Sequence, residues 1–391
     1  MTEAVIVAGA RTPIGRAHKG ALLDVDAFEL GKVAVGAAID RSGIPTEDVD
    51  DIVLAESLQG GGVIARYVAV DMGLDSIPGL ADNRHCAAGL SAVQIAAGSI
   101  RAGMDRVVVA GGTESLSSMV LGQKSVPASA QDPKLWMSPA NPPTPEAPPF
   151  DMALTVGENT ARIAGVTREA ADEWAFHSHR RAAHARDEGW FDPEIVPVEV
   201  PDGAGGTRTF ARDEHPRADT TLERLASLPV LHPELEKAVV TAGNAAGLND
   251  AAAAVVVTSD EYAGSHGLAP LARIVSWASV GIEPERTGLA PTLAIPKALD
   301  RAGLATTDID LWEINEAFCT MAVASSRALG LDHDVVNVNG SGCGLGHPIA
   351  ATGARMVVSM LHELRRRDLT MGCVAMCAGG GMGSALVLEL I

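Results

Sequence analysis

The sequence contains few aromatic residues and few positive charges. Phe, Trp and Tyr together make up 3% of the 391 residues, although hydrophobic residues make up 47%. Ala, Gly and Val therefore carry much of the apolar content, which favours tightly packed helices and buried strands. Lys and Arg number 30 against 49 Asp and Glu, giving a formal net charge of −19. This charge argues against nucleic acids and anionic membranes as partners, and any polyanionic ligand must bind at a local basic patch.

Long apolar runs and targeting signals are also missing. No stretch approaches the roughly 20 consecutive apolar residues of a membrane span, and the first nine residues lack the basic segment of a secretory signal. Five cysteines, an odd number in a chain of this length, do not suggest a disulfide framework. We expect these cysteines to be reduced thiols, as is usual for proteins in the cytosol. We therefore expect a soluble cytoplasmic protein of two or three domains.

A repeat within the chain indicates two related halves. Residues 38–50 and 298–310 align without a gap at an offset of 260. The identities between the two segments, in the numbering of the first, include Asp40, Arg41, Gly43, Thr46, Asp48 and Asp50. Each copy predicts a helix that ends at glycine, a turn and a short strand. A helical segment after Cys86 and another after Gly346 continue the correspondence, and each is followed by a buried strand that runs into glycine.

We predict an α/β fold in which the two halves flank an inserted segment. The expected domains are 1–120 plus 250–270, a loop domain at 121–249, and 271–391. Within the insert, residues 123–150 carry eight prolines, which predict an ordered loop or a flexible arm. Helices should follow, interrupted near Gly165 and starting again at Thr167. A polar hairpin is expected at 196–210.

Cys86, His347 and Cys377 carry the reactive groups, each beside small residues that let a substrate approach the backbone. We expect Cys86 at a helix N-terminus, where the dipole and free N–H groups lower a thiol pKa and suit a nucleophile. His347, held between glycine and proline, could take the thiol proton or donate to an oxyanion. Cys377, followed by the amides of 379–381, suits an acid/base thiol beside an oxyanion hole. Two thiols and an imidazole together suit carbon–carbon chemistry on thioesters.

Each of these residues also has a structural explanation. Either cysteine fits a buried core position, the common fate of this residue type, and a lone histidine in this setting is usually a surface turn residue. Cys373 and Cys377 lie four apart on a strand without a second pair at zinc spacing, so we expect no metal site. His177, His179 and His184 lie on a predicted helix, where we expect a solvated face.

Taken together, the motifs resemble those of the thiolases over the whole chain. They are residues 10–15, 111–115 and 240–250, Asn315-Glu316-Ala317-Phe318, residues 337–340, Gly346-His347-Pro348 and Cys377-Ala378-Gly379-Gly380-Gly381. The resemblance implies a duplicated βαβαβαββ core in five layers, α-β-α-β-α, with an inserted loop domain. It also implies an acyltransferase that uses CoA and acyl-CoA as substrates, holds no permanent cofactor or metal, and forms a homodimer or homotetramer.

The resemblance also implies roles for individual residues. Cys86 is the expected acylated nucleophile, His347 its activator, and Cys377 the acid/base thiol at the α-carbon. Asn315 would hold a water that forms one oxyanion hole with His347, although by itself it also fits a turn or capping residue. The N–H groups of Cys86 and Gly379 would form a second oxyanion hole.

Four further residues are expected to contact substrate or CoA: Arg217, Ala246, Phe318 and Met152. Arg217 aligns with a basic residue near the CoA nucleotide, but it equally fits a solvated loop arginine. Ala246 replaces a serine that contacts CoA in many thiolases. Ala87-Ala88 and Cys343 also depart from the common pattern. Thr287 stands near the place of a methionine that lines the small acyl pocket of acetoacetyl-specific members.

These departures leave every catalytic group present and favour a 3-ketoacyl-CoA thiolase, which cleaves its substrate with CoA through a Cys86 acyl-enzyme. Other activities remain open at this point. The first is an acetyl-CoA C-acetyltransferase that makes acetoacetyl-CoA, and the second is a non-catalytic carrier of acyl-CoA or lipid. A ketoacyl-carrier-protein synthase would need a second catalytic histidine where Cys377 stands, and a Cys-dependent thioesterase would release free acid without needing CoA as acceptor.

Overall fold

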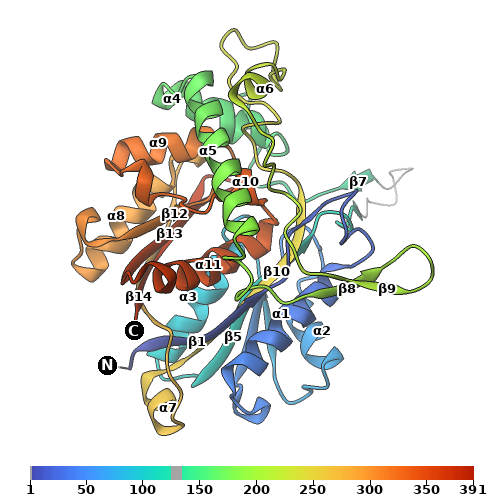
Figure 1. Ribbon diagram of the computed structural model, residues 1–391, viewed down its shortest axis with the longest axis vertical. Helices are drawn as coiled ribbons and strands as arrows, with labels where there is room; N and C mark the ends of the chain where they lie inside the picture. Colours follow the sequence, from blue (N-terminus) through green and yellow to red (C-terminus); the bar gives the residue numbers. More distant parts are fainter. Residues whose placement is uncertain (1, 125–133) are drawn as a thin grey trace.

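The computed structural model describes residues 2–124 and 134–391 as a mixed α/β structure (Figure 1). The N-terminal half contains β1 (Ala4–Arg11), β2 (Gly15–Arg16), α1 (Ala27–Ser42), β3 (Asp51–Ala55), α2 (Ile64–Asp71), β4 (Gly79–Asp82), α3 (Ala88–Arg101), β5 (Val107–Ser115), β10 (Asn249–Ser259) and α7 (Asp260–Ser265). The C-terminal half contains β11 (Ala272–Gly281), α8 (Pro291–Ala302), β12 (Leu311–Ile314), α9 (Cys319–Leu329), α10 (Gly342–Leu345), α11 (Thr352–Arg367), β13 (Met371–Ala378) and β14 (Met382–Leu390). Among the described residues, no helix is long and apolar enough to cross a membrane.

The strand order shows the duplication directly. The central ten-stranded sheet runs β12-β13-β14-β11-β1-β10-β5-β3-β4, and β2 pairs with β10. Outward from the middle, β11-β14-β13-β12 repeats β1-β10-β5-β3, with the same succession of antiparallel and parallel pairs. The halves join through two residue pairs between β1 and β11, Val5 with Arg273 and Ile6 with Ala272. A pseudo-twofold axis therefore passes between these two strands.

The repeated segment adopts the same local structure in both halves. Helix α1 ends at Gly43 with φ 66°, and α8 ends at Gly303 with φ 68°. This left-handed conformation is one that glycine adopts without a steric penalty. A short 3₁₀ turn follows in each half, at Thr46–Asp48 and Thr306–Asp308, and leads into β3 or β12. The helix, turn and strand predicted from the repeat are thus confirmed.

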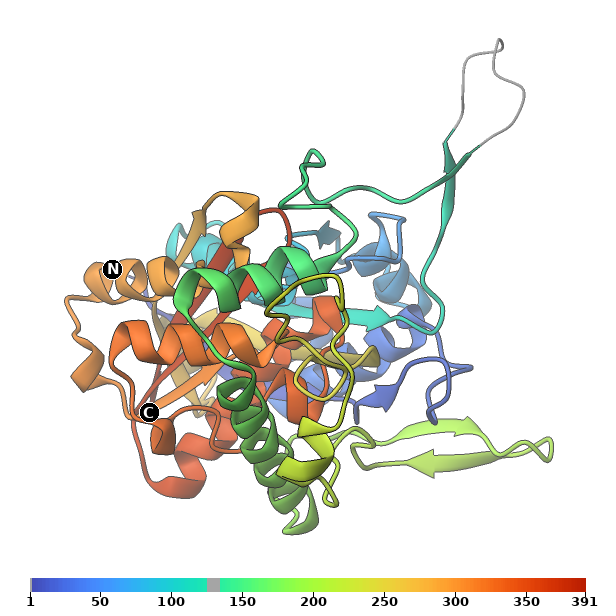
Figure 2. The same ribbon diagram turned by 90° about the horizontal axis from the view of Figure 1, so that it is seen from above.

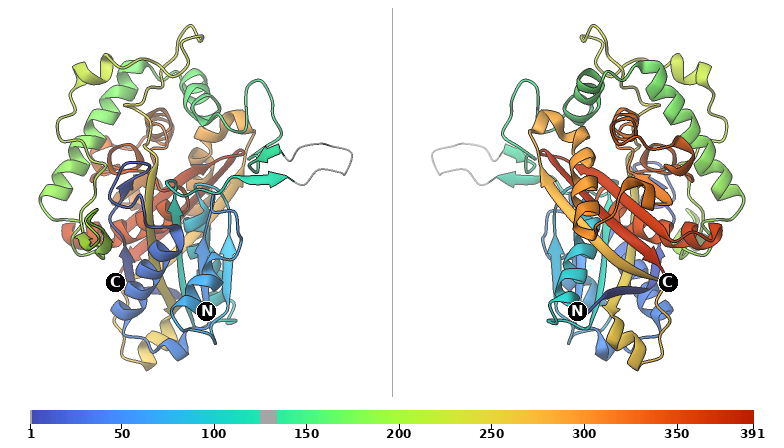
Figure 3. Two further views of the ribbon diagram at one scale, coloured as in Figure 1. Left: turned by 90° about the vertical axis from the view of Figure 1, so that its right-hand side faces the viewer. Right: turned by 90° about the vertical axis from the view of Figure 1, so that its left-hand side faces the viewer.

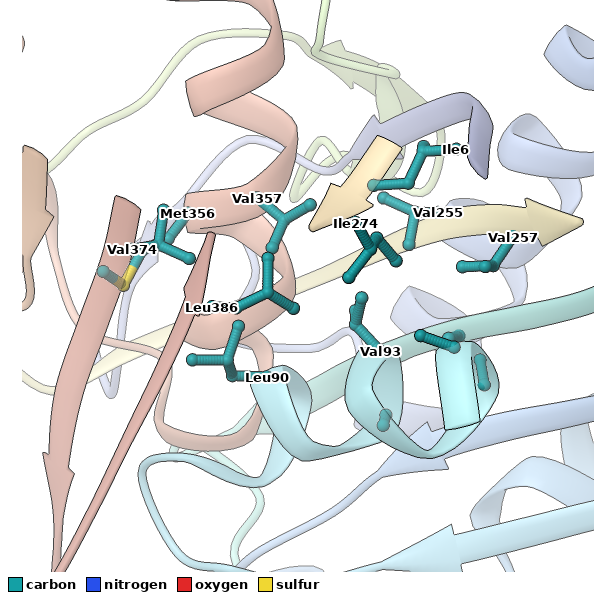
Figure 4. Close-up of a cluster of buried hydrophobic side chains, with 14 of the residues drawn as sticks. Ile6, Leu90, Val93, Val255, Val257, Ile274, Met356, Val357, Val374 and Leu386 are labelled. Carbon is teal, nitrogen blue, oxygen red and sulfur yellow. The ribbon is translucent and has the colours of Figure 1, made fainter. Parts of the chain in front are cut away.

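Two equivalent helices form the middle layer of the molecule. Leu90 and Val93 of α3 pack with Met356 and Val357 of α11 between strands of both halves, including the strand that carries Val374 (Figure 4). Helices α1 and α2 cover the opposite face of the N-terminal strands, and α8 and α9 cover that of the C-terminal strands. The layers are therefore α-β-α-β-α, and the predicted five-layer fold is confirmed.

The inserted segment forms helices and hairpins over one end of the core (Figure 3). It contains β6 (Gly122–Lys124), β7 (Lys134–Trp136), a π-helix (Ala153–Glu158), α4 (Asn159–Ala164), α5 (Arg168–Asp187), β8 (Val198–Pro201), β9 (Thr207–Phe210) and α6 (Leu222–Ala226). As predicted, α4 ends at Gly165 and the side chain of Thr167 caps α5 by accepting from the N–H of Ala170. The predicted hairpin is formed by β8 and β9, which extend from the body (Figure 2).

Two expectations for the insert need comment. Of the proline-rich stretch 123–150, residues 125–133 lie outside the described residues, and β6 and β7 pair on either side of them. The solvated helix face expected for the α5 histidines is wrong for His179. Its side chain is 2% exposed and stacks on His215, with ring centroids 6.0 Å apart. The domain boundaries stay a prediction.

Candidate active site

Cys86 lies in the turn between β4 and α3, two residues before the helix begins. The preceding residue, His85, has φ 47°, a left-handed conformation that non-glycine residues rarely adopt and that often marks functional sites. Burial raises the pKa of Cys86 to about 11. The backbone N–H groups of Gly379 and of Cys86 itself oppose that rise, and the Glu114 carboxylate adds to it. The lowered thiol pKa expected from a helix N-terminus is therefore wrong, because desolvation outweighs these N–H groups.

Close backbone contact brings the segment after Cys86 against the segment after His347. A methyl group at Gly89 would overlap with the carbonyl oxygen of Ala350, and one at Gly353 would overlap with the N–H of Leu90. Only glycine allows the first turns of α3 and α11 to approach so closely. Cys86 and His347, which precede these turns, therefore lie at the same end of the middle layer, as the offset of 260 predicts.

His347 is held on three sides. Its backbone N–H donates to Asn249 Oδ1 at 3.1 Å, and its ring Nδ1 lies 2.7 Å from Thr352 Oγ1. The third contact is with Asn315, whose Nδ2 lies 3.5 Å from His347 Nε2. Burial, assisted by the positive charge of Arg355, lowers the pKa of His347 to about 3, so the imidazole is neutral. With 7% of its surface exposed, His347 is not the surface turn residue that was its alternative.

Asn315 follows the last residue of β12 and is completely buried. Its backbone N–H donates to the carbonyl oxygen of Ala375 on β13, which fixes it beside the strand that carries Cys377. Its Oδ1 has no hydrogen-bond partner among the described residues, and a side chain at Gly342 would overlap with this oxygen. A buried polar atom without a partner is costly, so this oxygen is a place where a water molecule would bind.

Cys377 is buried near the end of β13, and its Sγ lies 3.4 Å from Met321 Sδ. Burial raises its pKa, and the nearby Cys86 raises it further, which indicates that the two thiols lie near each other. Gly379 follows two residues later, and a Cβ at this position would lie 3.7 Å from Met152 Sδ. The structure thus brings Cys86, Cys377, Gly379 and Met152 together.

The remaining predicted contacts, Ala246, Phe318 and Arg217, are linked to the site through neighbouring backbone segments. Ala246 donates its N–H to the carbonyl oxygen of Ala317 at 3.0 Å. The neighbouring Ala245 forms an isolated antiparallel β-bridge with the half-buried Phe318. Two residues after Ala246, Leu248 forms an isolated parallel β-bridge with His347. Arg217 is exposed and shares a surface hollow with Leu248. The roles assigned to these residues stay predictions.

Two family descriptions cover almost the entire chain. "Thiolase, N-terminal domain" matches residues 4–261, and "Thiolase, C-terminal domain" matches residues 268–390. The protein belongs to the thiolase family. As a thiolase it is an acyltransferase that uses CoA as a substrate and needs no permanently bound cofactor.

Relatives of this thiolase carry two kinds of name. The acetyl-CoA acetyltransferase of Cupriavidus necator is 42% identical over 404 aligned residues, and the 3-ketoacyl-CoA thiolase of Bacillus subtilis is 40% identical over 406; each alignment covers 100% of both chains. Among solved structures, the acetyl-CoA acetyltransferase of Bacillus anthracis has a TM-score of 0.91 at 38% identity, covering 100% of this chain and 99% of its own. Human mitochondrial 3-ketoacyl-CoA thiolase in complex with CoA has a TM-score of 0.92 at 36% identity, covering 100% and 98%.

Several residues of the thiolase site escaped prediction from the sequence. Thr352 orients the ring of His347, but it stands five residues later with no motif of its own. Glu316 is part of a motif that the sequence analysis names, but the sequence does not predict that its carboxylate accepts several hydrogen bonds. Its carboxylate accepts from Trp174 Nε1 at 2.8 Å and from Ser178 Oγ at 2.5 Å, which ties the loop-domain helix α5 to the residue after Asn315. Within residues 2–124 and 134–391, no group of three or more potential metal ligands was found.

Proposed function

We propose that this thiolase cleaves 3-ketoacyl-CoA with free CoA, giving acetyl-CoA and an acyl-CoA shortened by two carbons, as in fatty acid β-oxidation. The observation that carries the proposal is the proximity of two thiols in one site, the half-buried Cys86 and the buried Cys377. One thiol can hold an acyl group while the other moves a proton at carbon, which is what cleavage between C2 and C3 requires.

In the first half-reaction, the Cys86 thiol gives its proton to His347 Nε2 and its sulfur attacks the C3 carbonyl carbon. The N–H groups of Cys86 and Gly379 stabilise the resulting oxyanion. When this oxyanion collapses, the C2–C3 bond breaks and leaves the enolate of acetyl-CoA. His347 and a water held by Asn315 stabilise the enolate oxygen. Cys377 then protonates C2, and acetyl-CoA leaves.

In the second half-reaction, the Cys377 thiolate takes the proton of the incoming CoA thiol. The CoA sulfur attacks the acyl carbon on Cys86, and the same two N–H groups stabilise the second oxyanion. Collapse releases the shortened acyl-CoA, and protonated His347 returns its proton to Cys86. All groups are then in their starting states. Two half-reactions through one acyl-enzyme require ping-pong kinetics.

The proposed preference for acyl groups longer than acetyl is supported by Thr287. This residue is buried behind the glycines that follow Cys377, where its hydroxyl donates to the carbonyl oxygen of Pro284 at 2.6 Å and accepts from the N–H of Gly381 at 3.0 Å. A short side chain held in this way fills less space than the methionine expected in acetoacetyl-specific thiolases. The second candidate is the formation of acetoacetyl-CoA from two acetyl-CoA, which the acetyltransferase names of several relatives support equally.

A third alternative, a carrier of acyl-CoA or lipid without turnover, is disfavoured because all four groups are present, with Asn315 beside His347 and Cys377 near Cys86. We also propose a homodimer or homotetramer. Strand β4 ends the sheet order, and nearby apolar side chains at Tyr67, Val70 and Leu80 are between 44% and 53% exposed. Light scattering on the purified protein tests this assembly. The cytoplasmic location stays a prediction.

The decisive experiment compares initial rates of thiolysis of acetoacetyl-CoA and of a medium-chain 3-ketoacyl-CoA, with Cys86→Ala in parallel. We expect faster turnover of the longer substrate and loss of both activities in the variant. Turnover of acetoacetyl-CoA alone would point to the short-chain acetyltransferase. If wild type forms no acyl-enzyme with any substrate, catalysis is ruled out and a carrier is the better interpretation.

A further inference from the structure

Two buried side chains of opposite charge form an ion pair beside the candidate site. Arg355 on α11 is 1% exposed and Glu313 on β12 is 7% exposed, and Arg355 Nη1 donates to Glu313 Oε1. Burying such a pair removes both charges from water, and apolar side chains in its place often stabilise a protein equally well. A contribution to stability therefore does not account for this pair.

The ion pair connects the segments that carry Asn315 and His347. Glu313 is the third residue of β12, and Asn315 directly follows this strand. Side chains two residues apart on a strand point to the same face. Arg355 lies three residues after Thr352, whose hydroxyl contacts the His347 ring, and residues three apart on a helix are neighbours. The ion pair thus ties the strand before Asn315 to the helix that orients His347.

Ser341 joins a third segment to the ion pair. Its hydroxyl donates to Glu313 Oε1 at 2.8 Å, and Arg355 Nη2 donates to Ser341 Oγ at 3.5 Å. The next residue, Gly342, packs so closely against Asn315 that a side chain there would overlap with Asn315 Oδ1. The three polar side chains therefore hold a strand, a loop and a helix around the amide of Asn315.

A small cavity lies beside this network. Its volume is about 20 Å³, which is enough for one water molecule. Arg355 and Asn339 both line the cavity, and Arg355 Nε and Asn339 Oδ1 are buried without hydrogen-bond partners among the described residues. A single water would accept from the first atom and donate to the second. The guanidinium would then be held on every side by Glu313, Ser341 and this water.

The charge of Arg355 also acts on His347. Burial lowers the pKa of His347 to about 3, and Arg355 contributes to the decrease. Burial raises the pKa of Glu313, whereas Arg355 opposes that rise. Removing Arg355 alone would leave an unpaired acid in the core, which is strongly destabilising. An informative variant must therefore remove both charges together.

We propose that Arg355, Glu313 and Ser341 are positioning residues that hold Asn315 at the distance from His347 needed to stabilise the enolate oxygen. The inference rests on the proposed function and adds residues that act without touching the substrate. Asn315 Nδ2 lies 3.5 Å from His347 Nε2. This distance is too long for a strong hydrogen bond, so the direct contact does not by itself fix the two side chains.

The two proposed oxyanion holes should respond differently to loss of this network. The hole for the tetrahedral oxyanion consists of the N–H groups of Cys86 and Gly379, which lie in the turn before α3 and after β13. The hole for the enolate consists of His347 and a water on Asn315. Loss of the network should therefore weaken formation of the enolate more than acylation of Cys86.

The test variant is Glu313→Leu with Arg355→Met, which replaces the ion pair by apolar side chains. The matched control is Glu389→Leu with Arg273→Met, which removes a half-exposed ion pair between β14 and β11. Two rates are measured with acetyl-CoA: exchange of its α-protons with D₂O and pre-steady-state acylation of Cys86. A lost hydrogen bond to a charged oxygen corresponds to about a tenfold or larger decrease in rate.

We expect that decrease for exchange in the test variant alone, with acylation changed by less than about threefold and the midpoint of urea unfolding unchanged or raised. Unchanged exchange, or equal losses of exchange and acylation, would overturn the proposal. Should the double variant fold poorly, Ser341→Ala leaves the ion pair intact and removes only the link to the loop. It is expected to slow exchange and spare acylation, and undiminished exchange in this variant would also overturn the proposal.

A structural measurement keeps this inference distinct from the proposed function. If wild type shows neither exchange nor acylation, the proposed function fails, yet crystal structures of wild type and of the double variant still test the network. A longer distance between Asn315 Nδ2 and His347 Nε2 in the variant supports the positioning role. An unchanged distance overturns it.

Discussion

The hydroxyl of Thr352 determines which nitrogen of His347 can act as a base. Thr352 Oγ1 lies 2.7 Å from His347 Nδ1 and 2.8 Å from the carbonyl oxygen of Pro348. The single hydroxyl proton must go to the carbonyl, which can only accept, so the hydroxyl in turn accepts from Nδ1–H. This leaves the lone pair on Nε2, the nitrogen that faces Asn315. Thr352 therefore holds His347 in the tautomer that the proposed transfer of a thiol proton requires.

Replacing Thr352 by Val is expected to lower kcat by about 10- to 100-fold with little change in KM. Valine has nearly the shape of threonine but no acceptor, so a buried Nδ1–H would lose its partner, at a cost of about 1–3 kcal/mol. The other tautomer, with the proton on Nε2, would become favoured. The pre-steady-state rate of Cys86 acylation is the measurement. Thr352→Ser is the control and should restore most of that rate, whereas equal losses in both variants would indicate damaged packing instead.

Cys377→Ala should separate the two halves of the chemistry. Acylation of Cys86 by acetyl-CoA needs no proton at C2, so mass spectrometry should still find the acyl-enzyme. Exchange of the α-protons of acetyl-CoA with D₂O, followed by NMR, should be lost because the thiol next to Cys86 is gone. Loss of both activities to the same extent would contradict the assignment of separate roles.

The raised pKa of Cys86, about 11, predicts how its alkylation depends on pH. Only the thiolate reacts, and below the pKa its fraction grows about tenfold per pH unit. The rate of iodoacetamide labelling of Cys86 in the free enzyme should therefore keep rising between about pH 6 and pH 9 without a plateau. Cys86→Ala gives the background from other thiols. A plateau starting near neutral pH would show a thiolate already formed in the resting site.

Gly89→Ala should destabilise the protein, whereas Gly98→Ala on the same helix should not. At position 89 the added methyl would overlap with the Ala350 carbonyl oxygen, while at position 98 it would meet Trp277 at an ordinary 3.8 Å. We expect the free energy of unfolding to fall by about 3 kcal/mol or more in the first variant. In the second it should stay level or rise by about 0.5–1 kcal/mol, because alanine favours helix. Urea titrations of both variants measure the difference, and similar midpoints would contradict the close approach.

The sequence predicts the fold well because the fold is repeated. An ungapped match between residues 38–50 and 298–310 already implies two equivalent helices, turns and strands, and the mirrored strand order follows from that duplication. Boundaries in the insert were also predictable where glycine or a capping threonine ends or starts a helix, as at Gly165 and Thr167. These signals act within a few residues of the structure that they determine.

The properties that could not be predicted depend on distant parts of the chain. The pKa of Cys86 depends on how much protein covers the thiol. The helix that starts beside it predicts a lowered pKa, whereas burial raises it. His179 has the helical context of an exposed residue, but it is covered by His215 from another part of the insert. Thr352 acts through its distance to a ring, and no residue pattern in the sequence encodes that distance. Tertiary packing determines all three.

The pseudo-twofold axis between β1 and β11 relates the N-terminal end of α3 to that of α11. In an assembly of two identical half-chains, whatever residue stood before one middle helix would also stand before the other, so two thiols or two imidazoles would face each other. Fusion into one chain removes that constraint. In this chain the two halves differ at that point: the offset of 260 pairs Cys86 with Gly346, and His347 is the next residue, so a thiol and an imidazole stand at nearly equivalent places, as the proposed proton transfer between them requires.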